Sequence, residues 1–272
     1  MTARDLTPPS FRLTANRFGL LALASLLVLF LALPLVALVV RALPLGLAAW
    51  MNPNTLAALQ LSLVTATLAT LITFAIGTPV AYLLAREQFR GKAVVDTLID
   101  LPMVLPPAVA GIALLSAFGR RGLFGPALSV LGIELPFTTA AVIVAETFVA
   151  APFYVRSAKA GFGAVDKKLE QMSALLGVSN LATFFRITLP LAAPSLLSGL
   201  LMTWARALGE FGATIMFAGN FPGRTQTMPL AIYAGLESNL DSALALALIL
   251  VVVSFGTLFL IRAVSPKGIT LG

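Results

Sequence analysis

Long apolar stretches separated by short polar segments make up most of this chain. Six of them approach or exceed the roughly 20 residues that a helix needs to cross a bilayer. They cover residues 19–40, 55–85, 98–118, 138–155, 191–219 and 242–261. The second would be about 46 Å long at about 1.5 Å per residue, so we expect it to tilt or to protrude. The pattern predicts an all-α membrane protein with six transmembrane helices.

Residues 158–190 form the longest polar interruption, and their pattern predicts two short amphipathic helices. Apolar side chains share one face of the first helix: Leu169, Met172, Leu175 and Leu176. Gly177 suits the left-handed residue that closes a helix, and Ser179 or Asn180 can cap the next one. A second apolar face follows at Leu181, Phe184, Phe185 and Ile187, and Pro190 leads the chain into a new apolar run. Either the lipid surface, the bundle itself or a partner protein must receive these faces.

The composition excludes most soluble and catalytic classes. Of the 272 residues, 59% are hydrophobic and 11% are charged, whereas soluble domains are about 45–50% apolar and about 25% charged. The chain has no cysteine and no histidine. Disulfides, thiol chemistry, imidazole bases and metal sites built from Cys or His are therefore excluded.

The distribution of basic residues predicts the orientation in the membrane. Thirteen Lys and Arg fall in one set of tails and loops, four fall in the opposite set, and Arg206 lies within a span. This bias predicts that the tails (residues 1–18 and 263–272) and the 158–190 loop are cytoplasmic. It also explains the net charge of +7 without a nucleic-acid partner. The first stretch exceeds the about 7–15 apolar residues of a signal peptide and ends at Arg41, which favours a retained span.

Two charged residues, Arg206 and Glu210, lie inside the fifth apolar stretch. A charge at the bilayer centre costs about 2.5–3.5 kcal/mol on insertion scales, so both side chains should face protein or water. Two interpretations remain open. The residues line or gate a pathway, with Arg206 attracting an anion, or they pair with each other or with Glu146 and hold helices together.

Further polar and irregular positions are candidates for the same pathway. Gly209 and Gly212 allow a local break or a close helix approach. Thr214 and Asn220 can donate hydrogen bonds to an oxyanion or to the backbone. Three prolines at positions 102, 106 and 107 must interrupt the third span, and such backbone is tolerated only against protein or a water-filled cavity. On the second span, Ser62, Thr65 and Thr73 form a hydroxyl stripe that either lines a pathway or bonds its own helix.

The 158–190 segment resembles the loop before the penultimate or fifth span of ABC-importer permeases. That loop carries Glu-Ala-Ala, three residues, Gly, nine residues and Ile-x-Leu-Pro. Here Gly177 and the Ile187-x-Leu189-Pro190 group stand at those spacings, while Gln171-Met172-Ser173 replaces Glu-Ala-Ala and Glu170 stands one place earlier. In that family the loop is a coupling helix that sits in a groove of a separate ATPase. The resemblance implies these coupling residues: Glu170, Gln171, Met172, Ser173, Gly177, Ile187, Leu189 and Pro190.

A second segment is similar to the molybdate/tungstate branch of oxyanion permeases. It runs from Ala205 to Asn220 and continues with Pro222-Gly-x-Thr-Gln-Thr227 and Ala231-Ile-Tyr233, and the sulfate branch is similar through Gly212. With residues 101–107, the likeness covers roughly residues 55–262. It implies a type I ABC-importer transmembrane domain there, with only the first helix and its external loop (19–54) outside. The implied translocation pathway comprises Pro106, Pro107, Arg206, Gly209, Glu210, Gly212, Thr214 and Asn220.

The resemblance implies the permease subunit of an ATP-driven importer for a tetrahedral oxyanion, first molybdate or tungstate. The implied partners are a second copy of the chain, a cytoplasmic ABC ATPase dimer and an external oxyanion-binding protein, in a prokaryotic inner membrane. Gly91-Lys92 lacks the upstream glycine of a phosphate-binding loop. ATP and Mg²⁺ are therefore expected on the ATPase, and no cofactor, metal or catalytic residue is expected in this chain.

Several alternatives remain open. A sulfate permease fits much of the pattern, and so does a stand-alone secondary transporter in which Glu210 or Glu146 titrates. An intramembrane enzyme would have few groups to act as base or nucleophile. The residues do not distinguish a homodimer from a heterodimer.

Overall fold

The computed structural model describes residues 17–46 and 53–264, and within these ranges the chain is helical without strands. Five of the described helices are long and apolar enough to cross a membrane, or six if a bent pair counts as one span. The predicted all-α membrane class is thus confirmed. Residues 1–16, 47–52 and 265–272, which hold most of the two predicted tails and part of the first external loop, lie outside the described residues.

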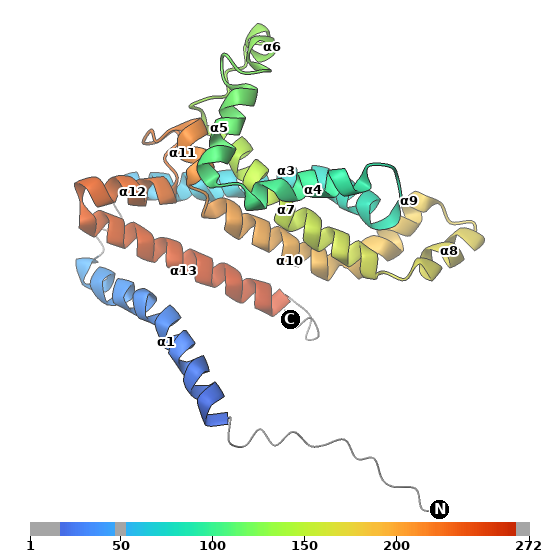
Figure 1. The fold of residues 1–272 in the computed structure, drawn as a ribbon, viewed down its shortest axis with the longest axis horizontal. Coiled ribbons are helices and arrows are strands. Elements are labelled where there is room, and N and C mark those ends of the chain that lie inside the picture. The colour runs from blue at the N-terminus through green and yellow to red at the C-terminus, as the bar shows by residue number, and fades with distance from the viewer. Residues whose placement is uncertain (1–16, 47–52, 265–272) are drawn as a thin grey trace, which may run out of the picture.

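Three long helices form the centre of the bundle. They are α3 (Pro53–Arg86), α7 (Thr139–Ala164) and α10 (Leu189–Leu208), and they lie side by side along most of their length (Figure 1). Small residues permit this approach: a side chain at Gly199 would collide with Ser157, and one at Gly161 would collide with Ser195. Apolar association gains little in lipid, so close packing of this kind is what holds membrane helices together.

Two helices flank this centre on one side. α13 (Leu240–Val264) follows α12 (Met228–Ser238), and Asn239 between them accepts hydrogen bonds from the backbone of Asp241 and Ser242. α1 (Arg17–Ala42), followed by the 3-10 turn Leu43–Leu45, lies apart from α3, α7 and α10 (Figure 1). The most apolar part of α1 buries none of its residues within the described chain, as expected of a helix that lipid solvates, and Ala42 at its end is buried.

Two of the predicted spans are not continuous helices. The third is divided into α4 (Lys92–Val104) and α5 (Pro107–Phe118), which are bent by 119°, and a short helix α6 (Gly125–Val130) follows. Pro106 and Pro107 have no N–H to continue the helix, and Leu105 is extended, as a residue before proline prefers. The expected interruption is confirmed. The fifth predicted span is also divided, because α10 ends at Leu208 and α11 (Gly212–Ala218) begins after a short break.

The polar loop differs from its prediction at both ends. α7 continues to Ala164, and α8 (Lys167–Leu175) and α9 (Asn180–Thr183) follow. Pro190 lies in the first turn of α10, where the predicted new apolar run begins, but no break precedes it, because the helix runs from Asn180 to Leu208 without a stop. A π-helical turn, η2 (Phe184–Thr188), widens the backbone before the proline, and the Leu189 N–H bonds the carbonyl of Phe184 five residues back. This wider turn accommodates a proline whose missing N–H would otherwise leave a carbonyl unpaired.

The contact between α5 and α11 yields a stability prediction. A methyl group at Gly212 would collide with the ring of Pro107, which cannot rotate away. We expect Gly212→Ala to destabilise the detergent-purified protein by about 1–3 kcal/mol, seen as a lower Tm. Gly256→Ala on α13 is the matched control, since nothing lies within 4 Å of the added methyl. Equal Tm values for the two variants would refute the close contact.

Candidate translocation and coupling sites

The two breaks in the bundle meet each other. Gly212 at the start of α11 faces Pro107 at the start of α5, and one turn further Gly111 faces Met216 and Ala213. Residues about one hundred positions apart in sequence therefore form one crossing of half-helices. Pro107 and Gly212, both predicted for the pathway, are brought together at this crossing. Pro106 beside them is exposed.

Glu210 closes the break between α10 and α11. Its Oε2 lies 2.7 Å from Arg206 Nη1, and its Oε1 accepts a hydrogen bond of 2.8 Å from the backbone N–H of Ala213. The Glu210 side chain is 1% exposed, whereas that of Arg206 is 30% exposed. The pairing left open by the sequence is present, and the carboxylate also caps the first turn of α11. Gly209, which ends α10, is exposed.

Glu146 of α7 is a second buried carboxyl group at mid-span. Thr65 of α3 donates a hydrogen bond of 2.9 Å to its Oε1, and within the described residues its Oε2 has no hydrogen-bond partner. The expected pairing with a cation is absent from the described contacts. The hydroxyl stripe on α3 mainly joins helices, because Ser62 Oγ accepts a hydrogen bond from the Met228 N–H at 2.7 Å. Thr73, the third member, has no partner among the described residues.

Two other predicted pathway residues hold unused hydrogen-bonding atoms. Thr214 is buried on α11, and its hydroxyl has no partner in the described part of the chain. Asn220 donates a long bond of 3.4 Å to the carbonyl of Leu230, while its Oδ1 is buried without a partner among the same residues. The Thr214 hydroxyl can donate a hydrogen bond to a passing anion, whereas the free Asn220 Oδ1 can only accept one, and the two residues form no acid, base or nucleophile set. No cluster of described residues could hold a metal ion.

The coupling segment has the local structure that its residues predict. Asp166 caps α8 by accepting a hydrogen bond from the Lys168 N–H, Gly177 has a φ of 74°, and Ser179 caps α9 at the Ala182 N–H. A hydrogen bond of 2.7 Å between the hydroxyls of Ser173 and Thr183 spans the turn. The two short helices are thereby joined on both sides of Gly177, and residues 167–186 form one coupling unit.

Glu170 anchors this unit to the bundle. Its Oε1 lies 2.9 Å from Arg86 Nη2 at the end of α3 and accepts a hydrogen bond of 2.7 Å from the Thr188 hydroxyl in η2. Arg86 also donates to the carbonyl of Val165 at 3.0 Å. The sequence analysis missed Arg86 and Thr188. A basic residue ending the second span and a hydroxyl before Leu189-Pro190 are the signals that could have indicated them.

The opposite face of the coupling unit is apolar and exposed. Its large side chains are Met172 at 61% exposure, Leu175 at 88%, Leu176 at 80%, Leu181 at 70% and Phe185 at 57%. Gln171 and Pro190 are exposed beside them, while Ile187 and Leu189 are half-buried. The bundle therefore receives the polar side of α8, and none of the residues that the structure describes covers the apolar side.

Comparison with known proteins identifies the family to which this chain belongs. Residues 77–268 match the family described as binding-protein-dependent transport system inner membrane component. The molybdenum transport system permease protein ModB of Mycobacterium tuberculosis is 43% identical over 242 residues, which are 89% of this chain and 92% of the relative. A probable molybdenum ABC transporter permease protein of Haloferax volcanii is 42% identical over 249 residues, covering 91% and 90% of the two chains.

A solved structure shares the fold. A chain of a bacterial ABC transporter involved in the import of the acidic polysaccharide alginate superposes with a TM-score of 0.75 at 16% identity, covering 93% of this chain and 96% of that chain. At this identity the likeness shows the fold alone. Family match, relatives and fold agree: this chain belongs to the binding-protein-dependent transport system inner membrane components, the permeases of ABC importers.

Proposed function

We propose that this chain is the membrane-spanning subunit of an ABC importer for a tetrahedral oxyanion, with molybdate as the first candidate. Family membership supports the importer role, and the names of relatives at 42–43% identity support molybdenum as the cargo element. Tungstate and sulfate are the alternatives, because they share the tetrahedral shape and the double negative charge. The chain itself performs no chemistry in this role.

The observation that carries the proposal is the exposed apolar face of the coupling unit. Large apolar side chains exposed outside the bilayer mark a surface that a partner protein covers. Lys167, Lys168 and Arg186 lie on the same unit, so it belongs to the strongly basic side of the membrane, which the charge bias predicts to be cytoplasmic. The partner that fits is an ABC ATPase dimer, which supplies the sites for ATP and Mg²⁺ that this chain lacks.

The anchor at Glu170 supplies the mechanical connection. Glu170 transmits movement of α8 along two routes. Its contact with Arg86 moves α3, and its contact with Thr188 moves η2 and α10. α10 carries Arg206 in its last turn and ends at Leu208, before the break that Glu210 closes. A pull on the coupling unit therefore reaches the crossing of α5 and α11 through one continuous helix. Closing of the ATPases on ATP would tilt the bundle in this way.

The remaining partners follow from the same assembly. A second copy of the chain completes the pathway, and exposed apolar side chains near the third-span break, such as Val104 at 82% and Ile112 at 51%, are available to face it. The segment from Asn220 to Thr227 lies at the opposite end from α8 (Figure 1), where an external oxyanion-binding protein would dock. In this arrangement both termini are cytoplasmic, in a prokaryotic inner membrane. Arg206 provides positive charge and the Thr214 hydroxyl provides a hydrogen-bond donor along the path, where Asn220 also lies.

Competition uptake tests the cargo. In cells carrying the complete system, we expect unlabelled molybdate and tungstate to suppress uptake of labelled molybdate, and sulfate to do so only at far higher concentration. The measurement is the concentration of each anion at half-inhibition. Equal inhibition by sulfate would make this a general oxyanion permease. Uptake by the chain alone in liposomes, without an ATPase, would refute the importer role.

Substitution at the hinge tests coupling. Gly177→Val forces a β-branched residue into a left-handed conformation, so we expect ATP hydrolysis by the assembled complex to continue while uptake falls about tenfold or more. Gly177→Asn should retain more uptake, because Asn tolerates that conformation. Gly132→Val, at φ 70° in an external connection, controls for left-handed strain alone. Undiminished uptake in Gly177→Val would count against the coupling role.

A third test separates anion contact from helix packing at Arg206. Arg206→Met alone leaves the buried Glu210 carboxylate without its cation, so we expect poor assembly. The double variant Arg206→Met with Glu210→Gln removes both charges and should assemble with the ATPase nearly as well as the wild type. If Arg206 serves the anion, the double variant still loses uptake. Wild-type uptake in the double variant would assign Arg206 to packing.

A further inference from the structure

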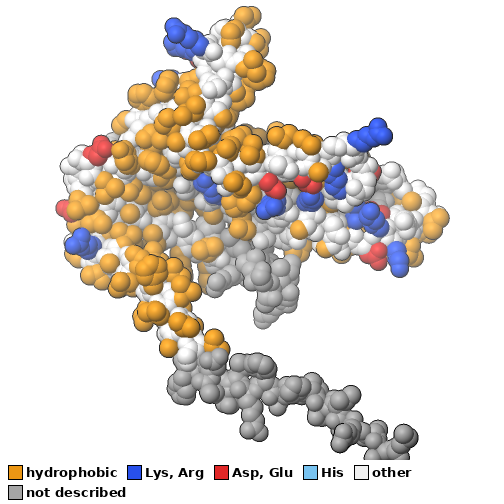
Figure 2. Space-filling view, viewed as in Figure 1, with side chains coloured by type: hydrophobic (Ala, Val, Ile, Leu, Met, Phe, Trp, Pro, Cys, Tyr) orange, Lys and Arg blue, Asp and Glu red, His pale blue; other side chains and the backbone are white. Residues whose placement is uncertain are grey.

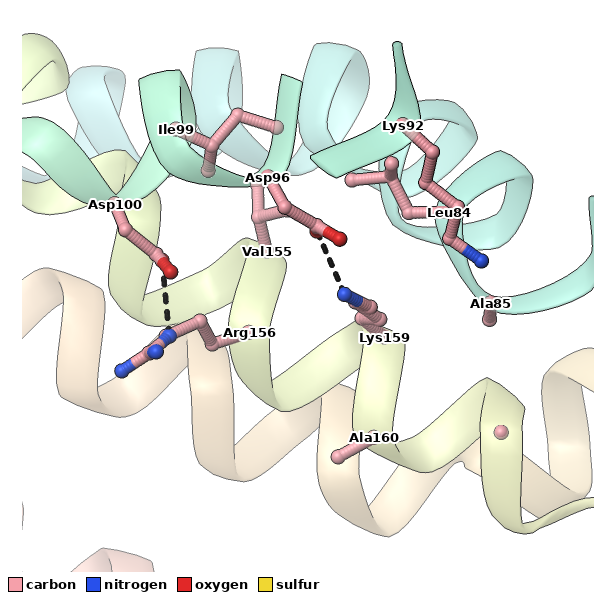
Figure 3. Close-up of a pocket in the computed structure, with 11 residues that line it drawn as sticks. Leu84, Ala85, Lys92, Asp96, Ile99, Asp100, Val155, Arg156, Lys159 and Ala160 are labelled. Atoms are coloured by element: carbon pink, nitrogen blue, oxygen red, sulfur yellow. Dashed lines mark hydrogen bonds and ion pairs between the residues drawn. The ribbon is translucent and has the colours of Figure 1, made fainter. Parts of the chain in front are cut away.

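A charged cleft separates α4 from α7 near the end of the bundle that carries α8. The cleft has a volume of about 550 Å³, and Asp96 and Asp100 on α4 face Lys159 and Arg156 on α7 (Figure 3). Lys92 also lines the cleft, and its Nζ donates a hydrogen bond of 3.0 Å to the Glu87 carbonyl. Figure 2 shows red and blue side chains along a line on this face of the molecule, over the region where Figure 1 labels α4 and α7. None of these residues belongs to the coupling unit or to the proposed anion path.

The charges form two ion pairs in a ladder. Lys159 Nζ lies 2.6 Å from Asp96 Oδ1, and Arg156 Nε lies 2.9 Å from Asp100 Oδ1. The two helices are antiparallel, because the later acid pairs with the earlier base. All four side chains keep between 31% and 61% of their exposure, so water reaches the pairs and they can separate at low cost.

The ladder holds a helix that has little else to hold it. No residue of α4 is buried, and only Val95 and Ile99 pack against the core shared by α3, α7 and α10. α4 also ends at the 119° bend before α5. A helix with few buried contacts and a break at one end is suited to sliding along its neighbour.

The spacing of the charges makes the two directions of sliding unequal. One turn corresponds to about 5.4 Å. A slide of α4 by one turn toward the α8 end brings Asp100 opposite Lys159, so one ion pair is regained while Asp96 moves to the level of Gly163. A slide the other way brings Asp96 opposite Arg156 but places Lys92 opposite Lys159, and these like charges repel.

We propose that Asp96, Asp100, Arg156 and Lys159 are positioning residues that set the register of α4 on α7 and permit a one-turn shift toward the α8 end during transport. The proposal rests on the proposed function, because uptake, assembly with the ATPase and the complex trapped with ATP and vanadate are its readouts. The shift moves the break at Pro106 relative to α11. It therefore links the position of α4 to the contact between α5 and α11.

Charge exchange distinguishes a sliding ladder from a fixed brace. Asp100→Arg with Arg156→Asp restores both pairs in the present register, but after the shift Arg at position 100 meets Lys159. Asp96→Lys with Lys159→Asp likewise places Asp100 opposite an acid after the shift. Exchange of all four charges restores attraction in both registers. We therefore expect each double exchange to assemble with the ATPase but to lose about tenfold in uptake rate, and the fourfold exchange to return within about twofold of wild type.

Several outcomes would overturn the proposal. Equal uptake by the double and fourfold exchanges, whether high or low, indicates a fixed brace. Absence of uptake by the wild-type complex would instead count against the proposed function.

Cross-linking provides a measurement that needs no oxyanion. The chain has no cysteine, so introduced pairs report without background. We expect Asp100→Cys with Lys159→Cys to cross-link more when the complex is trapped with ATP and vanadate than without nucleotide, and Asp100→Cys with Arg156→Cys to show the reverse. Unchanged yields for both pairs would overturn the register shift.

Discussion

Hydrocarbon offers no hydrogen bonds to peptide groups, so a helix inside a bilayer can stop only where protein satisfies or covers its ends. In this bundle two helices stop, one at Pro106-Pro107 and one at Gly209–Phe211, and each stop lies against the other. At the start of α5, Pro106 and Pro107 have no N–H groups that would need a partner. At the start of α11, Glu210 accepts a hydrogen bond from the Ala213 N–H. The glycines at 111 and 212 then allow the half-helices to touch. The architecture of the proposed pathway depends on this mutual protection.

The same constraint decides where charge is tolerated. Glu210 is buried because Arg206 and a helix N-terminus compensate it, and Arg206 keeps part of its surface. Glu170 is held by one guanidinium and one hydroxyl, outside the core of the bundle. The ladder between α4 and α7 is more exposed and therefore weaker. Charges thus range from a tightly held pair at the helix break to water-accessible pairs beside a loosely packed helix, which suits a protein whose halves must move.

The coupling unit reverses the usual orientation of an amphipathic helix. Its polar side faces the bundle through Glu170 and faces α9 through Ser173, and its leucines face outward. An isolated chain gains nothing from exposing Leu175 and Leu176 to water. The arrangement becomes favourable once a second protein covers them. The fold of this chain is therefore complete only as part of an assembly, consistent with its membership of a family of transport-system components.

Local chemistry allowed much of this molecule to be predicted from its residues. The apolar spans, the left-handed Gly177, the cap at Ser179 and the interruption by prolines depend on a few neighbouring positions, and so does the pairing of Arg206 with Glu210 one turn away. Contacts between distant segments were not accessible in that way. Nothing near Glu170 in sequence indicates Arg86, and nothing near Asp96 indicates Lys159. The 119° bend and the continuous helix through Pro190 were likewise decided by packing, because the backbone adopts whichever geometry satisfies its hydrogen bonds against the neighbouring helices.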